Sequence, residues 1–315
     1  METARYIIGL DGGGTKTAGV LCAPDGAILA EAQGGPSNFQ VIGVETAAKT
    51  ILDVIQSCCH TIGCSTAEIG ATVAGLTGAG RPNDQQRMAD AVLDEARNRS
   101  LILANVWVES DARIALEGAF SGKSGIIVIA GTGSIVFGKD RKGVVHRGGG
   151  WGRLIGDEGS GYAIGREAFR AVARMIDGRG ERTKLLALFG KKLELGTQEA
   201  IIEALYRKNF DVASAAPLVL EAAEKEDRVA QRILTEAREE LREVISSVFD
   251  RLRGSRKREE RIPLAFVGSL LTNQNSYSRG MRTAIRRTMP RISVQEAEAS
   301  PVVGAALMAA SRLSR

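Results

Sequence analysis

The sequence predicts an α/β protein built from two domains with a cleft between them. Its 315 residues are long for a single hydrophobic core, so two domains are expected. Two apolar, β-branched runs, 6–10 and 126–130, each lead directly into a glycine-rich turn. Strand-like runs then alternate with amphipathic stretches, as in sheets that are covered by crossover helices.

The first part of the chain begins as a hairpin meander. Apolar alternation predicts strands at 5–10, 17–23 and 27–33, with the glycine turn after the first strand and Pro24-Asp25-Gly26 after the second. Helical periodicity and short apolar runs then alternate. These segments predict a helix at 43–62, a strand at 69–74, a helix at 84–97 and a strand at 105–109.

The second part opens in the same way and then becomes mostly helical. Strands are expected at 126–130, 134–138 and 144–147, again with a glycine turn after the first strand. Later segments predict helices at 165–177, 197–208, 212–224 and 227–252, a strand at 262–267 and a helix at 276–288. The last helix, 301–312, is rich in alanine and glycine, which suits close packing, and we expect it to return to the first domain.

The two glycine turns predict nucleotide phosphate binding. Each places glycine where the backbone would approach an anion, leaving amide N–H groups and a hydroxyl as donors. The alternatives fail on spacing. The run 118–124 is one residue short of a P-loop and precedes a strand, and Val136 stands where a dinucleotide fingerprint needs its third glycine.

The composition is that of an ordinary globular protein and disfavours several other classes of protein and site. No apolar run reaches membrane-spanning length and residues 1–5 lead directly into the first strand, so we expect a cytoplasmic protein. The basic run 251–261 contains two glutamates and no aromatic residue, which favours a solvated helix end over a nucleic-acid surface. With only His60 and His146 present, nucleophilic or zinc chemistry based on histidine is disfavoured, and we expect His146, near the glycine-rich segment, to be structural. Four cysteines occur in the first fifth of the chain, without a matching later pair, and are expected to be reduced thiols: Cys22, Cys58, Cys59 and Cys64.

Motifs spread over nearly the whole chain resemble those of a known family, and they come in the family's order. They are Asp11-Gly12-Gly13-Gly14-Thr15-Lys16-Thr17, Glu109-Ser110-Asp111-Ala112, Ala130-Gly131-Thr132-Gly133-Ser134, Gly149-Gly150-Trp151-Gly152, Gly156-Asp157-Glu158-Gly159-Ser160-Gly161 and Phe266-Val267-Gly268-Ser269. The chain looks like the N-acetylglucosamine kinase branch of the BadF/BadG/BcrA/BcrD ATPase family, within the actin-like ATPase and sugar kinase superfamily. The resemblance implies a two-domain actin-like (ribonuclease H-like) fold. Its N-terminal domain would be 1–118, completed by 298–315, and its larger, more helical C-terminal domain 119–297.

The resemblance also implies roles for individual residues, with ATP and Mg²⁺ as cofactors. Asp11 would hold Mg²⁺, through water because Mg²⁺ dehydrates reluctantly. Asp111 would be the general base, although the residues alone leave helix capping equally open. The ATP phosphate and adenosine contacts would be Gly12, Gly13, Gly14, Thr15, Lys16, Gly131, Thr132, Gly133, Ser134, Gly268 and Ser269. The sugar contacts would be Asn38, Gly75, Leu76, Asp111, Thr132, Gly150, Trp151, Gly152 and Asp157.

The function that this resemblance predicts is an ATP-dependent kinase for a hexose or amino sugar, with the 6-hydroxyl of N-acetylglucosamine as the leading acceptor. Glucosamine, glucose and N-acetylmuramic acid remain open as substrates. An ATPase that energises a redox partner, as in the benzoyl-CoA reductase relatives, is the alternative from another class. It is disfavoured because the second domain has no cysteine to hold a cluster, and a non-enzymatic sugar sensor ranks last. The expected partner is a small-molecule sugar, with no nucleic acid and no membrane, and the family favours a homodimer.

Overall fold

The computed structural model of the chain describes residues 5–254 and 260–313. The chain divides into two compact units, unit 1 (Met1–Ser124 and Glu296–Arg315) and unit 2 (Gly125–Gln295). The boundary proposed from the sequence at 118/119 falls one residue before the end of helix α4 (Asp111–Ala119). The boundary in the structure lies a few residues later, after the turn that leads into the first strand of unit 2.

Unit 1 contains a five-stranded sheet with the order β3-β2-β1-β4-β5. The first three strands form an antiparallel meander, and β4 and β5 continue the sheet in parallel with β1. The strands are β1 (Tyr6–Gly12), β2 (Thr17–Cys22), β3 (Ile28–Gly34), β4 (Ile69–Leu76) and β5 (Val106–Ser110). Because parallel strands end at the same edge, β1, β4 and β5 place the residues that follow them side by side.

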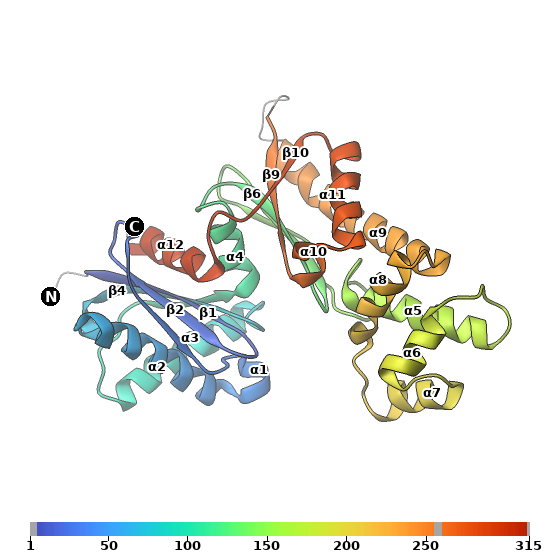
Figure 1. The fold of residues 1–315 in the computed structure, drawn as a ribbon. Coiled ribbons are helices and arrows are strands. Elements are labelled where there is room, and N and C mark those ends of the chain that lie inside the picture. Colours follow the sequence, from blue (N-terminus) through green and yellow to red (C-terminus); the bar gives the residue numbers. More distant parts are fainter. Residues whose placement is uncertain (1–4, 255–259, 314–315) are drawn as a thin grey trace. The chain divides into compact units, whose positions relative to one another are not determined.

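Helices cover both faces of this sheet (Figure 1). On β1, Ile8 and Leu10 point to the face covered by α2 (Val44–Ile62) and α3 (Pro82–Asn98), whereas Ile7 points to the opposite face. That opposite face is covered by α4 and by the C-terminal helix α12 (Pro301–Leu313). The strand alternates between two buried faces, so its near-continuous apolar sequence is explained by burial on both sides.

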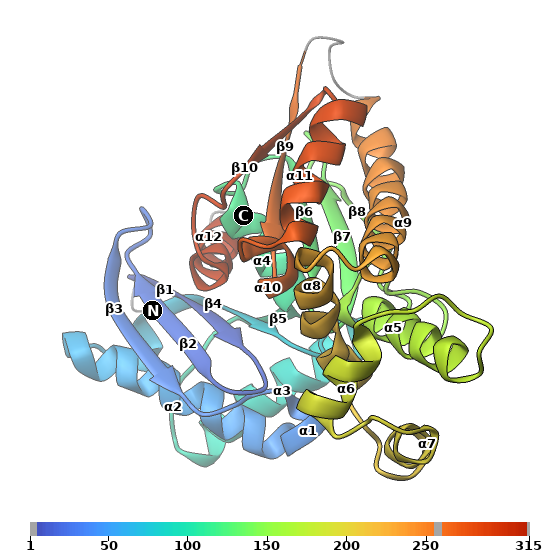
Figure 2. The same cartoon turned by 45° about the vertical axis from the view of Figure 1, so that its right-hand side comes forward.

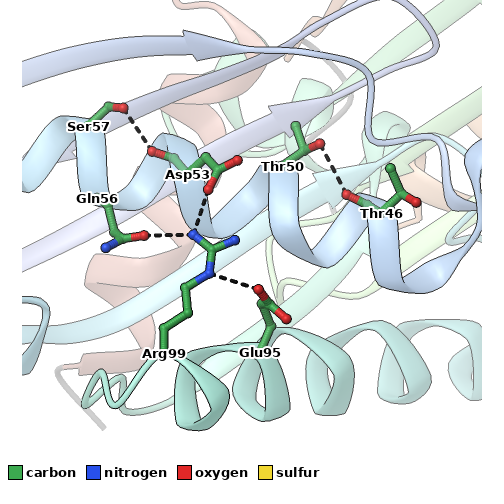
Figure 3. Close-up of polar contacts among 7 residues, drawn as sticks. All are labelled: Thr46, Thr50, Asp53, Gln56, Ser57, Glu95 and Arg99. Carbon is green, nitrogen blue, oxygen red and sulfur yellow. Dashed lines mark hydrogen bonds and ion pairs between the residues drawn. The ribbon is translucent and has the colours of Figure 1, made fainter.

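Arg99, at the C-cap of α3, ties α3 to α2 (Figure 3). Its guanidinium donates to Asp53 Oδ1 at 2.6 Å and to Gln56 Oε1 at 2.8 Å on α2, and to Glu95 Oε1 at 2.8 Å on α3. The hydrogen bond that Arg99 donates to Asp53 is the largest cause that raises the pKa of Arg99. This fork-like contact holds the two helices together beneath the sheet.

Unit 2 repeats the strand arrangement of unit 1. Its sheet has the order β10-β9-β6-β7-β8, with β6, β7 and β8 antiparallel and β9 and β10 parallel to β6. The strands are β6 (Gly125–Ala130), β7 (Ser134–Lys139), β8 (Val145–Gly149), β9 (Ile262–Val267) and β10 (Ile292–Gln295). Both glycine turns therefore follow the first strand of a sheet and lead into an antiparallel partner.

The remaining part of unit 2 is helical (Figure 2). The helices are α5 (Gly161–Ile176), α6 (Leu185–Leu193), α7 (Gln198–Arg207), the 3-10 helix η2 (Val212–Ala215), α8 (Ala216–Glu224), α9 (Arg228–Arg253), α10 (Ser269–Thr272) and α11 (Ser276–Thr288). The long helix α9 packs its apolar stripe on β7 and β8. It ends at Arg253, and residues 255–259 of the basic run lie outside the described part of the chain.

The predicted α/β architecture is confirmed, and each strand and helix expected from the sequence is present close to its expected bounds. The elements that were not predicted with bounds have nine residues or fewer: α1 (Phe39–Ile42), the 3-10 helix η1 (Thr66–Glu68), α4, α6, α10 and β10. An element with few helical turns or few strand residues is too short to show a periodic pattern of apolar residues. Among the described residues, no helix is both long enough and apolar enough to cross a membrane.

Candidate active site

Three parallel strands of unit 1 end in register at one edge of the sheet. Gly12 of β1 is paired with Leu76 of β4, and Leu76 is paired with Ser110 of β5. The next residues, Thr77 and Asp111, therefore follow at neighbouring positions of that edge. Thr77 N–H donates to the carbonyl of Gly12 at 2.9 Å and so joins the end of β4 to the end of β1.

Asp111 is the first residue of α4, and its carboxylate accepts two hydrogen bonds. Thr77 Oγ1 donates to Oδ2 at 2.8 Å, and the N–H of Ala112 donates to Oδ1 at 2.7 Å. The N-cap of α4 is Ser110, whose Oγ accepts from the N–H of Arg113. Ser110 thus occupies the N-cap position, and Asp111 accepts one further N–H of the first turn. The half-buried Asp111 carboxylate keeps lone pairs for another partner.

Asp11 lies one residue before the end of β1 and shares the electrostatic environment of Asp111. Burial raises the pKa of Asp11, the negative charge of Asp111 raises it further, and Lys16 lowers it. A cation bound beside Asp11 would relieve this repulsion. No cluster of three or more histidine, cysteine or acidic side chains that could hold a metal occurs within residues 5–254 and 260–313. A site with only one or two carboxylates is compatible with Mg²⁺, because this ion typically binds one or two carboxylates together with substrate phosphates and water.

The first glycine turn (residues 12–16) is tightly held at its base and open at its tip. Gly13 N–H donates to the carbonyl of Lys16 at 3.0 Å, closing the hairpin between β1 and β2. The carbonyl of Gly13 accepts from the N–H groups of Ser37 and Asn38 at 3.0 and 3.1 Å. At the tip, Gly14, Thr15 and Lys16 are exposed. Their amides and the ammonium group are available for an anion.

Three residues of unit 1 that were predicted to contact the sugar lie near this turn, and they differ in the chemical group that a ligand could reach. Asn38 caps α1, and its Oδ1 accepts from the N–H of Gln40. Gly75 packs against α4, since a Cβ there would lie 2.2 Å from Ile114 Cδ1. Leu76 is fully buried. Any contact that Gly75 or Leu76 makes with a ligand would therefore come from the backbone.

The second glycine turn (residues 131–134) is held by the N-terminus of α5. Gly161 N–H donates to the carbonyl of Gly131 at 2.8 Å, and Tyr162 N–H donates to the carbonyl of Thr132 at 3.0 Å. Ser134 is buried, and its Oγ donates to the carbonyl of Glu158 at 2.8 Å. Thr132 remains exposed at the tip of the turn. The carbonyls of Gly131 and Thr132 therefore point toward α5.

Asp157 lies against this second turn. Its backbone has a φ of 60°, and its Oδ1 accepts from the N–H of Ser134 at 3.4 Å. Burial raises the pKa of Asp157, Glu158 raises it further, and the hydrogen bonds from Ser134 and Gly152 lower it. The structure thus places Asp157, which was predicted to contact the sugar, next to the glycine turn that was predicted to bind phosphate.

The glycine-rich loop 149–152 leaves its tryptophan in solvent. Gly149, Gly150 and Gly152 all have positive φ, and Trp151 is 70 % exposed. Arg147 stands 5.8 Å from the centre of the Trp151 ring and donates to the carbonyl of Gly150. The ring is supported on one side by a cation and is otherwise free to meet a ligand.

A cavity of about 470 Å³ opens beside the second turn within unit 2. It includes the predicted residues Gly131, Thr132 and Ser269. Gly161 belongs to a quoted motif but was not assigned to a ligand. The residues that the sequence did not indicate are Asp211, Ala213, Ser214, Ala216, Pro217, Leu220, Leu270, Asn273, Gln274 and Asn275. The amide-rich run 273–275, which begins four positions after Ser269, was the available signal. The side chain of Asn275 is used internally, because it caps α11 and donates to two carbonyls, so Asn273 and Gln274 are the amides that face solvent.

Gly268 precedes the cavity residue Ser269 and packs against the end of β6. Its φ is 91°, and a Cβ there would lie 2.4 Å from the carbonyl oxygen of Ala130. Only glycine fits so close to the strand that carries the second turn. The predicted contact at Gly268 is therefore explained by packing as well as by any ligand.

The cysteines and histidines do not join these sites. Burial raises the pKa values of Cys22 and Cys58 to about 11 and that of Cys59 to about 12, as expected of inert thiols. The ring of His146 lies 3.3 Å from Asp140 at the β7–β8 turn.

Two sheets with one strand order, each with a glycine turn after its first strand, are the architecture of the actin-like ATPases. The sequence profile of the BadF/BadG/BcrA/BcrD ATPase family matches residues 8–309, and the chain belongs to this family.

Relatives span almost the whole chain. The N-acetylmuramic acid/N-acetylglucosamine kinase of Clostridium acetobutylicum is 34% identical over 98% of this chain and 99% of its own. The N-acetyl-D-glucosamine kinase of Dictyostelium discoideum is 32% identical over 97% of this chain and 98% of its own. A solved structure from Chromobacterium violaceum, assigned as an N-acetylglucosamine kinase, is 27% identical, with a TM-score of 0.69 over 97% of this chain and 99% of its own.

Proposed function

We propose that this protein is an ATP-dependent kinase that phosphorylates the 6-hydroxyl of N-acetylglucosamine. The observation that carries the proposal is the Asp111 carboxylate at the edge of the unit 1 sheet, next to the first glycine turn and Asp11. Relatives of nearly the same length and more than 30% identical are named as N-acetylglucosamine kinases, which supports the sugar.

In this mechanism Asp111 acts as the general base. It accepts the proton of the sugar hydroxyl while that oxygen forms a bond to the γ-phosphorus of ATP. The bond between the γ-phosphorus and the β–γ bridging oxygen breaks, and ADP leaves. Bound Mg²⁺ would supply charge neutralisation on the phosphates. Asp11 would hold it through water, and Lys16 would add a positive charge near the same phosphates.

The remaining residues bind and orient the substrates. We assign the phosphates to the two glycine turns, and the nucleoside end of ATP to the unit 2 cavity with Gly268 and Ser269. For the sugar we assign Asn38, the backbone of Gly75 and Leu76, Asp111, Thr132, Asp157 and the loop Gly150-Trp151-Gly152. We also propose a cytoplasmic homodimer, and light scattering on the purified protein measures the oligomeric state directly.

The substrate is tested by ADP release from Mg²⁺-ATP, alone and with N-acetylglucosamine, N-acetylmuramic acid, glucosamine, glucose or N-acetylmannosamine. We expect strong stimulation by N-acetylglucosamine. Stimulation by N-acetylmuramic acid as well would match the breadth in the name of the Clostridium relative. Hydrolysis that no sugar stimulates would overturn the kinase proposal.

The base is tested by Asp111→Asn. We expect the variant to keep its affinity for ATP and to lose turnover by about 10²- to 10⁴-fold, the range that general base catalysis supplies. Asp94→Asn is the matched control, because that carboxylate lies exposed on α3. Turnover near that of the unmodified protein in Asp111→Asn would remove Asp111 from the role of base.

A further inference from the structure

Thr77 is a polar residue at the edge of the unit 1 sheet that the sequence did not single out. Its hydroxyl donates to Asp111 Oδ2 at 2.8 Å, and its own N–H donates to the carbonyl of Gly12 at 2.9 Å. Thr77 thus connects the start of the first glycine turn with the carboxylate on α4. We propose that Thr77 is a positioning residue, which fixes the orientation of the Asp111 carboxylate for proton transfer; this inference rests on the proposed function of Asp111.

The geometry gives the hydroxyl a defined task. The two oxygens of Asp111 each receive one donor, Thr77 Oγ1 at Oδ2 and the N–H of Ala112 at Oδ1. Two donors on opposite oxygens define the plane of the carboxylate, whose terminal torsion is less restricted when only one donor is present. Threonine is stiff at χ1, so its hydroxyl is held in place by its own backbone. That backbone is fixed in turn by the bond to Gly12.

Thr72, which lies in the strand that Thr77 follows, offers a control that separates the shape of the side chain from its hydrogen bond. Thr72 of β4 is fully buried, and its Oγ1 has no hydrogen-bond partner among the described residues. At Thr72 the strand uses the β-branched shape of the side chain, and the hydroxyl makes no hydrogen bond with the described residues. At Thr77 the hydroxyl has one partner, and that partner is the proposed base. Thr77→Val and Thr72→Val therefore make the same chemical change, but only Thr77→Val removes a hydrogen bond to Asp111.

The experiment compares kcat and KM for Mg²⁺-ATP and N-acetylglucosamine in the unmodified protein and in Thr77→Val, Thr77→Ala, Thr77→Ser and Thr72→Val. We expect both Thr77→Val and Thr77→Ala to lower kcat by about ten- to a hundredfold, as a misplaced catalytic group does, with KM for ATP unchanged. Thr77→Ser keeps the donor and should restore kcat to within about threefold. Thr72→Val should leave all constants unchanged. Thermal melting verifies that each variant is folded, and Thr77→Ala provides the result if Thr77→Val does not fold.

A double variant identifies the group through which Thr77 acts. Combined with Asp111→Asn, Thr77→Val should change the residual kcat by less than about twofold, because its effect requires the Asp111 carboxylate. Unchanged kcat in Thr77→Val, with Asp111→Asn inactive, would overturn the positioning role and leave the proposed function intact. A rise in KM at constant kcat would also overturn it, because Thr77 would then bind a ligand directly. Absence of sugar-stimulated turnover in the unmodified protein would overturn both proposals.

Discussion

Two carboxylates and one ammonium group dominate the electrostatics of the unit 1 site. The pKa of Asp11 is raised by its own burial and by the charge of Asp111, and Lys16 offsets only part of this. An ionised Asp11 is therefore unfavourable in the folded chain without a bound cation. Such a pair is costly to stability and useful for binding Mg²⁺-ATP, which is a common compromise at catalytic sites.

Replacement of Asp11 by Asn tests that compromise. A carboxylate whose pKa is raised in the folded state destabilises the fold once it is ionised, so stability is lost as pH rises from the unfolded value, 3.8, through the raised pKa. Asp11→Asn removes this charge. We expect a higher free energy of unfolding than in the unmodified protein at neutral pH, a difference that narrows as pH falls through the raised pKa, and loss of Mg²⁺-ATP turnover.

Urea unfolding at a series of pH values measures this difference, with Asp94→Asn as the exposed control. A variant that is less stable than the unmodified protein at neutral pH would contradict the unfavourable environment of Asp11. Equal turnover would contradict its role in holding Mg²⁺.

Local sequence predicted the elements that position the site, and it failed where partners are distant. The hairpins around both glycine turns followed from β-branched runs and glycines that are adjacent in the chain. The contact between Thr77 and Asp111 spans 34 positions, because it depends on the parallel pairing of β4 with β5. The contact between Ser134 and Asp157 likewise depends on how α5 returns to the turn. Periodicity carries no information on such pairings, so the motifs were found but their geometry was not.

The C-terminal helix α12 shows how small residues join elements that are distant in the chain. A Cβ at Gly304 would lie 2.0 Å from the carbonyl oxygen of Ile114 on α4, and one at Gly9 of β1 would lie 2.3 Å from the N atom of Ala306. The backbones of α12, α4 and β1 are therefore in direct contact. Because α4 begins with Asp111, this packing also supports the proposed base from behind.

Gly304→Ala tests this packing. Within a helix, alanine is favoured over glycine by about 1 kcal/mol. The clash with backbone atoms of α4 cannot be relieved by a side-chain rotation, and overpacking of this kind costs about 1–3 kcal/mol. We expect a net decrease in the free energy of unfolding. Gly80→Ala is the control, since no atom lies within 4 Å of a Cβ there. Stabilisation by Gly304→Ala in urea unfolding would show that α12 is not held by this contact.

The two units share one topology and differ in the chemistry that they place on it. In unit 1 the first strand ends with Asp11 and Gly12, whereas in unit 2 the first strand ends with Ile129 and Ala130. Unit 2 instead carries the cavity of about 470 Å³ beside its glycine turn. The same framework thus presents the proposed base, Asp111, in unit 1 and a pocket beside the glycine turn in unit 2, which is consistent with a division between the proposed general base and the proposed nucleoside site.

This division predicts which segments of the chain are protected by the nucleoside of ATP and which by its phosphates. Adenosine alone should slow hydrogen–deuterium exchange at the cavity, including residues 269–275, and leave residues 12–16 unchanged. A non-hydrolysable ATP analogue with Mg²⁺ should add protection at both glycine turns, because only its phosphates engage the amides of the turns. Helix α3 serves as the internal control, since none of its residues lines the cavity. Protection of residues 12–16 by adenosine, or none at 269–275 with either ligand, would place the nucleoside outside the unit 2 cavity and contradict the division.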